Sequence, residues 1–256
     1  MNTTNNTILI TGGGSGIGRG LAEAFHALGN QVIIAGRSQK KLDETTGANP
    51  GMKSLTVDMT DGDSIQAFSA QLTQDYPKLN VVINNAGVMA PETLLDQKPG
   101  VPDVEAVITT NLLGPIRLTA ALLPSLLEQP HSTIVNVSSG LAFVPLAMTP
   151  TYCATKAALH SYTESLRYQL KATSVEVLEL VPPYVQTELM GEQQASDPRA
   201  MPLDAFLAEV MSLFAADPTP SEICVKTVHP LRFAADGGQD KYSQVFNGLN
   251  DAMSAH

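Results

Sequence analysis

Cysteine is almost absent from this sequence: Cys153 and Cys224 are the only two among 256 residues, and they lie far apart. This count excludes a disulfide framework and a cysteine-rich metal site, and it fits a reducing compartment. Basic residues are also scarce, with 15 Lys and Arg against 25 Asp and Glu. Because such an acidic surface repels phosphate backbones, we do not expect a nucleic-acid partner.

Long apolar runs are missing as well. The first apolar run, residues 8–10, is too short for the hydrophobic region of a signal peptide. No segment approaches the roughly 20 apolar residues of a membrane span. We therefore expect a cytoplasmic protein with no membrane partner. With 43% apolar and 16% charged residues the composition is that of a folded chain, and the length suits one large domain.

Short apolar runs alternate with longer helical patterns as far as residue 183. The runs are nearly continuously apolar, as expected of parallel strands covered on both faces. This alternation predicts an α/β fold: a single doubly wound Rossmann-type domain over residues 1–256, with a parallel sheet, helices on both faces and C-terminal helices. We expect strands at residues 7–11, 32–35, 55–57, 81–83, 134–137 and 175–181, and helices at 16–28, 38–47, 61–75, 102–128 and 151–172.

The alternation stops after residue 183. Residues 184–201 are polar and loop-like, and residues 202–216 have apolar side chains at helical spacing. We expect the region 184–216 to form the substrate loop or lid. A further helix is expected over residues 220–236, because residues 219–222 resemble a capping box with proline at the first helical position. It would bury Ile223, Val228 and Leu231, with a kink at Pro230.

A glycine-rich turn separates the first predicted strand from the first predicted helix. Gly12, Gly16 and Gly18 have the spacing G-x-x-x-G-x-G, which suits a turn that needs bare backbone or positive φ. The helix that follows points free N–H groups at an anion, and a pyrophosphate is the natural ligand. An ordinary tight turn is the alternative, but the position between strand and helix favours dinucleotide binding.

The end of the second predicted strand indicates which dinucleotide is bound. NAD sites usually place an acidic residue there for the ribose 2′-hydroxyl, whereas this chain has Gly36. Arg37 follows, with Ser38 beside it, and an arginine can hold a 2′-phosphate through charge-assisted hydrogen bonds. We therefore expect NADP(H) rather than NAD(H). The alternative is that Arg37 is one surface charge among several, since Lys40 and Lys41 follow closely.

Tyr152 and Lys156 are the strongest candidates for catalysis. They lie four residues apart on a predicted helix and so share a face, and Ser139 ends the strand upstream. A tyrosine hydroxyl can supply the proton that carbonyl reduction requires, if a nearby ammonium lowers its pKa from about 10. Ser139 can polarise the carbonyl. Asn111 is a candidate for holding a water between the lysine and solvent, or simply a residue at a helix bend.

Together and in this order, these motifs resemble the short-chain dehydrogenase/reductase family from residue 11 to about residue 187. The resemblance implies a Rossmann-type fold, a nicotinamide cofactor and a catalytic tetrad of Asn111, Ser139, Tyr152 and Lys156. Ser139 matches the serine of the family better than Ser138 does, because it precedes the tyrosine by thirteen residues. The residues expected to bind the cofactor are Gly12, Ser15, Gly16, Ile17, Gly18, Arg37, Ser38, Asp58, Met59, Asn85, Ala86, Gly87, Tyr152, Lys156, Pro182, Val185 and Thr187. Asp58 is the candidate for the adenine amino group, and Thr187 matches the position that holds the carboxamide.

Two departures from the family pattern affect the expectations. Pro182 and Pro183 stand where the family commonly has Pro-Gly, and the second proline stiffens the loop. The helix expected over residues 220–236 leaves no seventh strand and argues against the tetramer contact that this strand often supports. We therefore expect a homodimer through the helices at 102–128 and 151–172. The two prolines, residues 138–146 and the C-terminal helices are similar to a bacterial subgroup named after DltE.

The sequence thus predicts an NADP(H)-dependent carbonyl reductase or alcohol dehydrogenase. Its small-molecule substrate would be a ketone or secondary alcohol with apolar groups. The alternatives are a non-catalytic dinucleotide-binding redox sensor and an NAD-linked alcohol dehydrogenase. Candidate walls of the substrate pocket are Met89, Leu141, Phe143, Tyr184 and Met190. None of the five histidines is paired at metal-ligand spacing, so no metal site is expected.

Overall fold

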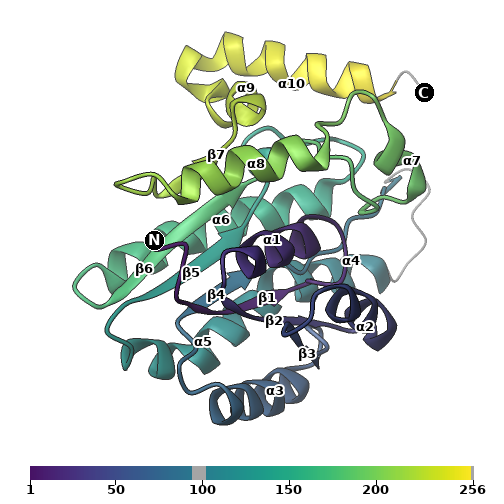
Figure 1. The fold of residues 1–256 in the computed structure, drawn as a ribbon. Coiled ribbons are helices and arrows are strands. Elements are labelled where there is room, and N and C mark those ends of the chain that lie inside the picture. Colours follow the sequence, from purple (N-terminus) through teal and green to yellow (C-terminus); the bar gives the residue numbers. More distant parts are fainter. Residues whose placement is uncertain (94–101, 255–256) are drawn as a thin grey trace.

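Seven parallel strands form one sheet whose order reverses at its middle. The computed structural model describes residues 1–93 and 102–254, and within them the strand order is β3-β2-β1-β4-β5-β6-β7 (Figure 1). Because β1 lies between β2 and β4, the β1–β4 junction is the switch point at which such sheets bind ligands. The strands are β1 (Thr7–Thr11), β2 (Gln31–Gly36), β3 (Lys53–Thr56), β4 (Val81–Asn84), β5 (Ser132–Val137), β6 (Val175–Val181) and β7 (Glu222–Cys224).

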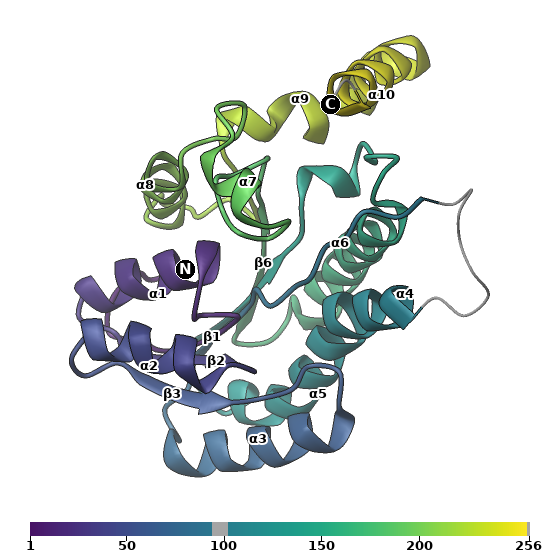
Figure 2. The same cartoon turned by 90° about the vertical axis from the view of Figure 1, so that its right-hand side faces the viewer.

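Helices cover both faces of the sheet, as the sequence predicts (Figure 2). The helices are α1 (Gly16–Ala27), α2 (Gln39–Ala48), α3 (Gly62–Asp75), α4 (Pro102–Ile108), α5 (Gly114–Leu127), α6 (Pro150–Leu170), α7 (Glu192–Ser196), α8 (Leu203–Phe214), α9 (His229–Arg232) and α10 (Gly238–Ser254). One face is covered by α1, α2 and α8, and the other by α3, α5 and α6. The doubly wound Rossmann-type fold is therefore confirmed.

Successive strand residues contribute to two separate cores. Ile8 and Ile10 pack in a cluster with Phe206 from α8, whereas Leu9 packs in a second cluster with Phe68 from α3. Successive side chains of a strand point to opposite faces, so a strand covered on both sides needs an apolar residue at every position. This explains why the strand sequences are continuously apolar rather than alternating.

The helix predicted over residues 102–128 is present, with one irregular turn. A π-helical turn, Thr109–Leu113, joins α4 to α5 and carries Asn111. Single π turns widen a helix locally and are frequent at functional sites. Asn111 therefore lies at an irregular turn of the helix, as the helix-bend alternative expects.

This helical run corrects one expectation about membranes. Val104–Leu127 has the length and, with a mean hydropathy of 1.4, the composition of a membrane-spanning helix, whereas no such segment was expected from the sequence. Leu118, Leu122 and Leu126 from this run are buried in the core beneath the sheet. Their packing there accounts for part of the apolar composition, since 44% of the apolar window is buried.

The expectation of one helix over residues 220–236 is wrong. Glu222–Cys224 form β7 instead, with Ile223 opposite Leu180 of β6 and fully buried. Three short helical segments follow it, namely η4 (Lys226–Val228), α9 and η5 (Ala234–Gly237). A strand of three residues leaves no periodicity to detect, and Pro230 lacks the N–H that a continuous helix would require. Since the seventh strand exists, the argument against a tetramer contact no longer applies, and the homodimer stays a prediction.

The chain ends in a helix that the sequence pattern did not delimit. Gly237 and Gly238 lead into α10, which is 17 residues long. This helix lies beyond β7, away from the sheet (Figure 1). Asn250 anchors it, because its Oδ1 accepts a hydrogen bond from the Ala147 backbone N–H at 2.6 Å and its Nδ2 donates to the Pro145 carbonyl at 3.2 Å.

The packing of α8 gives a stability prediction. Phe206 is fully buried, whereas Phe233 is 44% exposed. We expect Phe206→Ala to lower the free energy of unfolding by about 3–5 kcal/mol through lost burial and a residual cavity. The matched change Phe233→Ala should cost about 1 kcal/mol or less. Urea denaturation measures both, and equal losses would contradict the packing of α8 on the sheet.

Candidate active site

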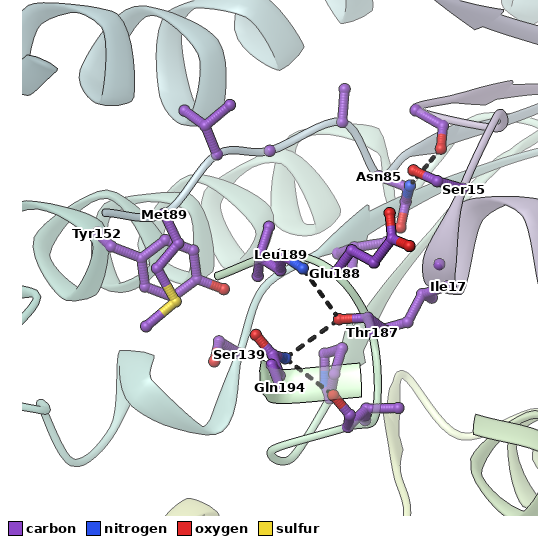
Figure 3. A pocket seen from close by; sticks show the side chains of 18 of the residues that line it. Ser15, Ile17, Asn85, Met89, Ser139, Tyr152, Thr187, Glu188, Leu189 and Gln194 are labelled. Carbon is purple, nitrogen blue, oxygen red and sulfur yellow. Dashed lines mark hydrogen bonds between the residues drawn. The ribbon is translucent and has the colours of Figure 1, made fainter. Parts of the chain in front are cut away.

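A cavity of about 480 Å³ opens at the carboxyl ends of β1 and β4, where the strand order reverses. The two strand ends are tied together by side chains. Thr11 Oγ1 accepts hydrogen bonds from the backbone N–H groups of Asn85 and Ala86, each at 3.0 Å, and Asn85 Nδ2 donates to the Thr11 carbonyl at 2.9 Å. In Figure 3, Ser15 and Asn85 lie toward one end of this cavity and Tyr152 toward the other.

Most of the residues predicted to form the site line this cavity. They are Gly12, Ser15, Gly16, Ile17, Arg37, Asn85, Ala86, Gly87, Ser139, Tyr152, Lys156, Pro182, Val185 and Thr187. Residues that the sequence analysis did not assign to cofactor binding also contribute, among them Lys41, Pro183, Glu188, Leu189 and Gln194. The cavity therefore unites residues of the glycine turn, the ends of β2, β4, β5 and β6, and α6.

The glycine turn forms one end of the cavity. Gly12 and Gly16 have φ of +68° and +53°, in the left-handed region that favours glycine. Gly18 does not line the cavity, but a Cβ at this position would collide with the Asn85 side chain and the Gly12 carbonyl. Ser15 precedes α1, whose first turn holds no acidic residue. The free N–H groups at this helix start are suited to an anion.

Two cations, Arg37 and Lys41, lie at the mouth of the cavity near this turn. Lys41 Nζ forms an exposed ion pair with Glu188 Oε2 at 3.7 Å. Within residues 1–93 and 102–254, Arg37 forms no ion pair. Its guanidinium is thus available to a further anionic group.

Besides Gly18, three predicted cofactor ligands lie outside the set of described residues that line the cavity. The Ser38 hydroxyl instead caps α2 by accepting from the Lys41 backbone N–H at 3.4 Å. Asp58 Oδ1 accepts hydrogen bonds from the Thr60 N–H and hydroxyl at 2.9 and 2.8 Å, and these bonds lower the pKa of Asp58. Met59 is buried against Gly114. Adenine recognition by these residues stays a prediction.

Ser139, Tyr152 and Lys156 converge at the other end, as predicted. They are 7%, 6% and 4% exposed, and all three line the cavity. Lys156 Nζ donates a hydrogen bond to the Val137 carbonyl at 2.7 Å and lies 5.6 Å from the centroid of the Tyr152 ring. The Ser139 hydroxyl faces Tyr152 closely enough to lower the pKa of its phenol. The four-residue spacing on α6 places both side chains over the end of β5.

Burial controls the protonation of this pair. Desolvation raises the pKa of Tyr152 to about 12, although the hydrogen bond with Ser139 lowers it. Desolvation lowers the pKa of Lys156 to about 8, although the charge of Glu179 raises it. The sequence-based expectation that the ammonium would bring the pKa of Tyr152 below 10 is therefore not met in this structure, because burial outweighs the other influences.

Asn111 supports the site through the backbone of the neighbouring loop. Its Oδ1 accepts from the Val88 N–H at 2.9 Å, and its Nδ2 donates to the Val88 carbonyl at 2.9 Å and to Thr155 Oγ1 at 3.3 Å. The side chain thereby fixes the segment that follows β4, one of the walls of the cavity. The expected role in holding a water near Lys156 stays a prediction.

A buried carboxylate that the sequence reasoning did not identify lies under α6. Glu179 of β6 is fully buried, and its Oε2 is 2.8 Å from Nδ1 of His160. His160, Glu179 and Glu222 bring potential metal ligands within 4.8 Å of one another. However, Arg232 Nη2 already donates to Glu222 Oε1 at 2.8 Å. The guanidinium therefore supplies the positive charge of this cluster.

A second cavity of about 280 Å³ adjoins the first. Both cavities are lined by Ser139, Tyr152 and Gln194. Its other walls are mainly apolar, and they are Met89, Gly140, Leu141, Leu146, Pro182, Pro183, Tyr184, Leu189, Met190, Arg199, Leu231, Leu249, Ala252 and Met253. Four of the five candidate walls are thus found. Phe143 is the exception, because its ring packs edge-on against His160, 4.7 Å between centroids.

A model of the short chain dehydrogenase family matches residues 6–198 of this chain. That span includes the glycine turn, the strand ends and the Ser139, Tyr152 and Lys156 cluster. The chain is a short-chain dehydrogenase.

The relatives of this short-chain dehydrogenase agree with the assignment. It is 40% identical over 256 residues to the oxidoreductase DltE of Bacillus subtilis (strain 168), and the match covers 98% of both chains. This confirms the resemblance to the DltE subgroup. A short-chain dehydrogenase from Streptomyces avermitilis superposes with a TM-score of 0.77 at 26% identity, covering 100% of this chain and 95% of that one. A serine dehydrogenase, solved in a closed form with NADP+, superposes with a TM-score of 0.74 at 26% identity and covers 84% and 90%.

The His160–Glu179 contact gives a prediction about stability and pH. The hydrogen bond to Glu179 raises the pKa of His160 above its usual 6.5. The resulting stabilisation is fully present below about pH 6.5 and is lost as pH rises through the higher folded-state pKa. We expect His160→Gln to lower the free energy of unfolding by about 1.5–3 kcal/mol near pH 5.5. The loss near pH 9 should be about half of this or less.

Urea denaturation at the two pH values measures this difference. His131→Gln, a change of the same kind at an exposed position, serves as the control and should have little effect at either pH. A loss for His160→Gln that is the same at both pH values would contradict a charged His160–Glu179 pair.

Proposed function

We propose that this oxidoreductase is an NADP(H)-dependent carbonyl reductase acting on ketones with apolar substituents. One observation carries the proposal: Ser139 and Tyr152 line both cavities. A group held in the larger cavity and a carbonyl held in the smaller one would meet at these two hydroxyls.

The larger cavity suits a phosphorylated dinucleotide. The left-handed glycines leave bare backbone at the start of α1, which fits a pyrophosphate. Gly36 ends β2 without a carboxylate, and Arg37 beside it is free to hold a 2′-phosphate. The NADP+ in the related serine dehydrogenase supports the same choice. Residues of the chain would hold the cofactor at both ends, with Lys156 and Thr187 on the nicotinamide side.

When bound, a reduced nicotinamide supplies the hydride that converts a carbonyl carbon into an alcohol carbon. The Ser139 hydroxyl donates a hydrogen bond to the carbonyl oxygen and stabilises the negative charge that develops there. The Tyr152 hydroxyl gives its proton to that oxygen, and the phenolate that remains is reprotonated from the Lys156 ammonium or solvent.

The protonation states of the site suit the proposed reduction. The Tyr152 phenol has a pKa of about 12. The oxygen that receives its proton is about as basic as hydroxide, whose conjugate acid, bulk water, has a pKa of about 15.7, so the phenol is the stronger acid. Proton transfer from the phenol to the oxygen that becomes negative during reduction is therefore favourable in free energy. Oxidation would need the phenolate, which burial disfavours.

The smaller cavity indicates the substrate class. Its walls are mainly apolar, and Arg199, its one charged lining residue among those described, is paired with Asp197 at 2.7 Å. A neutral substrate with apolar groups on either side of the carbonyl fits this lining better than an anion does.

Replacement of Tyr152 tests catalysis against the alternative of a redox sensor. Wild-type protein should oxidise NADPH with members of a panel of aryl and alkyl ketones. Tyr152→Phe should lower kcat by about 10²–10⁴-fold, because it removes the proton donor. Its affinity for NADPH should change little. Absorbance at the nicotinamide band measures turnover, and fluorescence titration measures binding. If both proteins bind NADPH but neither turns over any ketone, the sensor function is favoured instead.

Replacement of Arg37 tests the choice of cofactor. Arg37→Asp should weaken NADPH by about 10–100-fold, because it replaces a phosphate partner with a repelling charge. The affinity for NADH should change by about threefold or less. The control is Lys40→Asp, which makes the same charge change at an exposed neighbour outside the described cavity lining. Equal effects of Arg37→Asp on the two cofactors would favour the NAD-linked alternative.

A further inference from the structure

Gln194 occupies the junction between the two cavities. It belongs to α7 and is 6% exposed, whereas the neighbouring Gln193 is exposed. Its side chain lines both the larger and the smaller cavity. Figure 3 shows the amide directed toward Thr187. A polar group buried at such a junction acts on whatever the two cavities bind.

The hydrogen bonds of Gln194 fix the orientation of its amide. Nε2 donates to the Val185 carbonyl at 2.8 Å and to Thr187 Oγ1 at 3.1 Å, while Oε1 accepts from the Met190 N–H at 3.0 Å. The opposite orientation would place the amide oxygen against the Val185 carbonyl and the NH₂ group against the Met190 N–H. The first contact would place two acceptors together and the second would place two donors together, so Nε2 must face Thr187.

This orientation determines what the Thr187 hydroxyl can do. A hydroxyl has one donor and two acceptor positions. Thr187 Oγ1 accepts from Gln194 Nε2 and, at 3.5 Å, from the Leu189 N–H. Both acceptor positions are then occupied, and the O–H hydrogen remains for a different acceptor. Within the part of the chain that the structure describes, no acceptor for this hydrogen is found, and Thr187 lines the larger cavity.

We propose that Gln194 is a positioning residue that keeps the Thr187 hydroxyl available as a donor to the carboxamide oxygen of the nicotinamide. This inference rests on the proposed function. Gln194 thereby links the loop that covers the substrate cavity to recognition of the cofactor. The acceptor on the cofactor could also be a pyrophosphate oxygen, since Thr187 Cγ2 lies 3.4 Å from the Cβ position of Gly16 in the glycine turn. The test distinguishes the two oxygens.

The test measures binding rather than turnover. Two ligands are compared by titration: NADPH, and 2′-phospho-ADP-ribose, which has the same phosphates but no nicotinamide. In Gln194→Glu a carboxylate would accept the Thr187 hydrogen and withdraw it from the cofactor. We expect the Kd of NADPH to rise about tenfold and that of 2′-phospho-ADP-ribose to rise by about threefold or less. Gln193→Glu adds the same charge at an exposed position and should change either Kd by about twofold or less.

Two further variants separate this role from a structural one. Gln194→Met removes the hydrogen bond to Thr187 without adding charge, and it should raise the Kd of NADPH by about threefold. This variant replaces Gln194→Glu in the test if Gln194→Glu does not fold. In a Thr187→Val background, Gln194→Glu should no longer alter the ratio of the two dissociation constants. Either result supports the positioning role.

The opposite results overturn it. If Gln194→Glu weakens both ligands equally, the residue acts on the phosphates or on the loop as a whole, and the carboxamide assignment is wrong. The inference also fails if the effect persists in the Thr187→Val background, or if no Gln194 variant changes the ratio. A wild-type protein that binds neither ligand overturns the proposed function as well. If the wild-type protein binds both ligands but the Gln194 variants do not change the ratio of the two dissociation constants, the inference alone is overturned.

Discussion

The hydrogen bond from Lys156 to the Val137 carbonyl, at 2.7 Å, joins α6 to the end of β5, and the geometry of the site depends on it. Ser139 lies two residues beyond Val137, and Tyr152 lies one helical turn before Lys156. One contact therefore sets the relative position of all three groups. It also gives a buried ammonium a partner, without which burial would favour the neutral amine more strongly. Glu179, fully buried on the adjacent strand, adds a negative charge that opposes the same effect.

Burial of this pair also sets its protonation state. Below about pH 8 the amine is protonated and the phenol is neutral. Both groups then hold a proton, as the proposed reduction requires. The surroundings of Glu179 keep this arrangement stable. His160 shares a hydrogen bond with Glu179, and Arg232 neutralises the neighbouring Glu222. The acidic cluster beneath α6 is thus balanced by its own cations.

The sequence predicts the parts of this structure that repeat or follow a fixed spacing. Apolar runs revealed six of the seven strands, because strands covered on both faces exclude polar residues. The four-residue spacing of Tyr152 and Lys156 placed both on one helical face, and the glycine spacing identified the turn. The strand β7 escaped detection, because three residues at a sheet edge carry no period. Glu179 and Gln194 were missed for a different reason: each acquires its role from partners that only the fold brings together.

The least regular part of the sequence supplies much of the lining of the smaller cavity. Residues 1–183 provide six of the seven strands and most of the lining of the larger cavity, whereas the apolar walls of the smaller cavity come largely from the loop after β6 and from Leu249 and Met253 of α10. That helix is fixed at Asn250, and its Leu249 and Met253 pack against the core cluster that includes Tyr152. The segments that line the smaller cavity therefore differ only in part from those that line the larger one. Gln194 lines both cavities and bonds to Val185 and Thr187 in the loop after β6, so it can transmit a change in one cavity to the other.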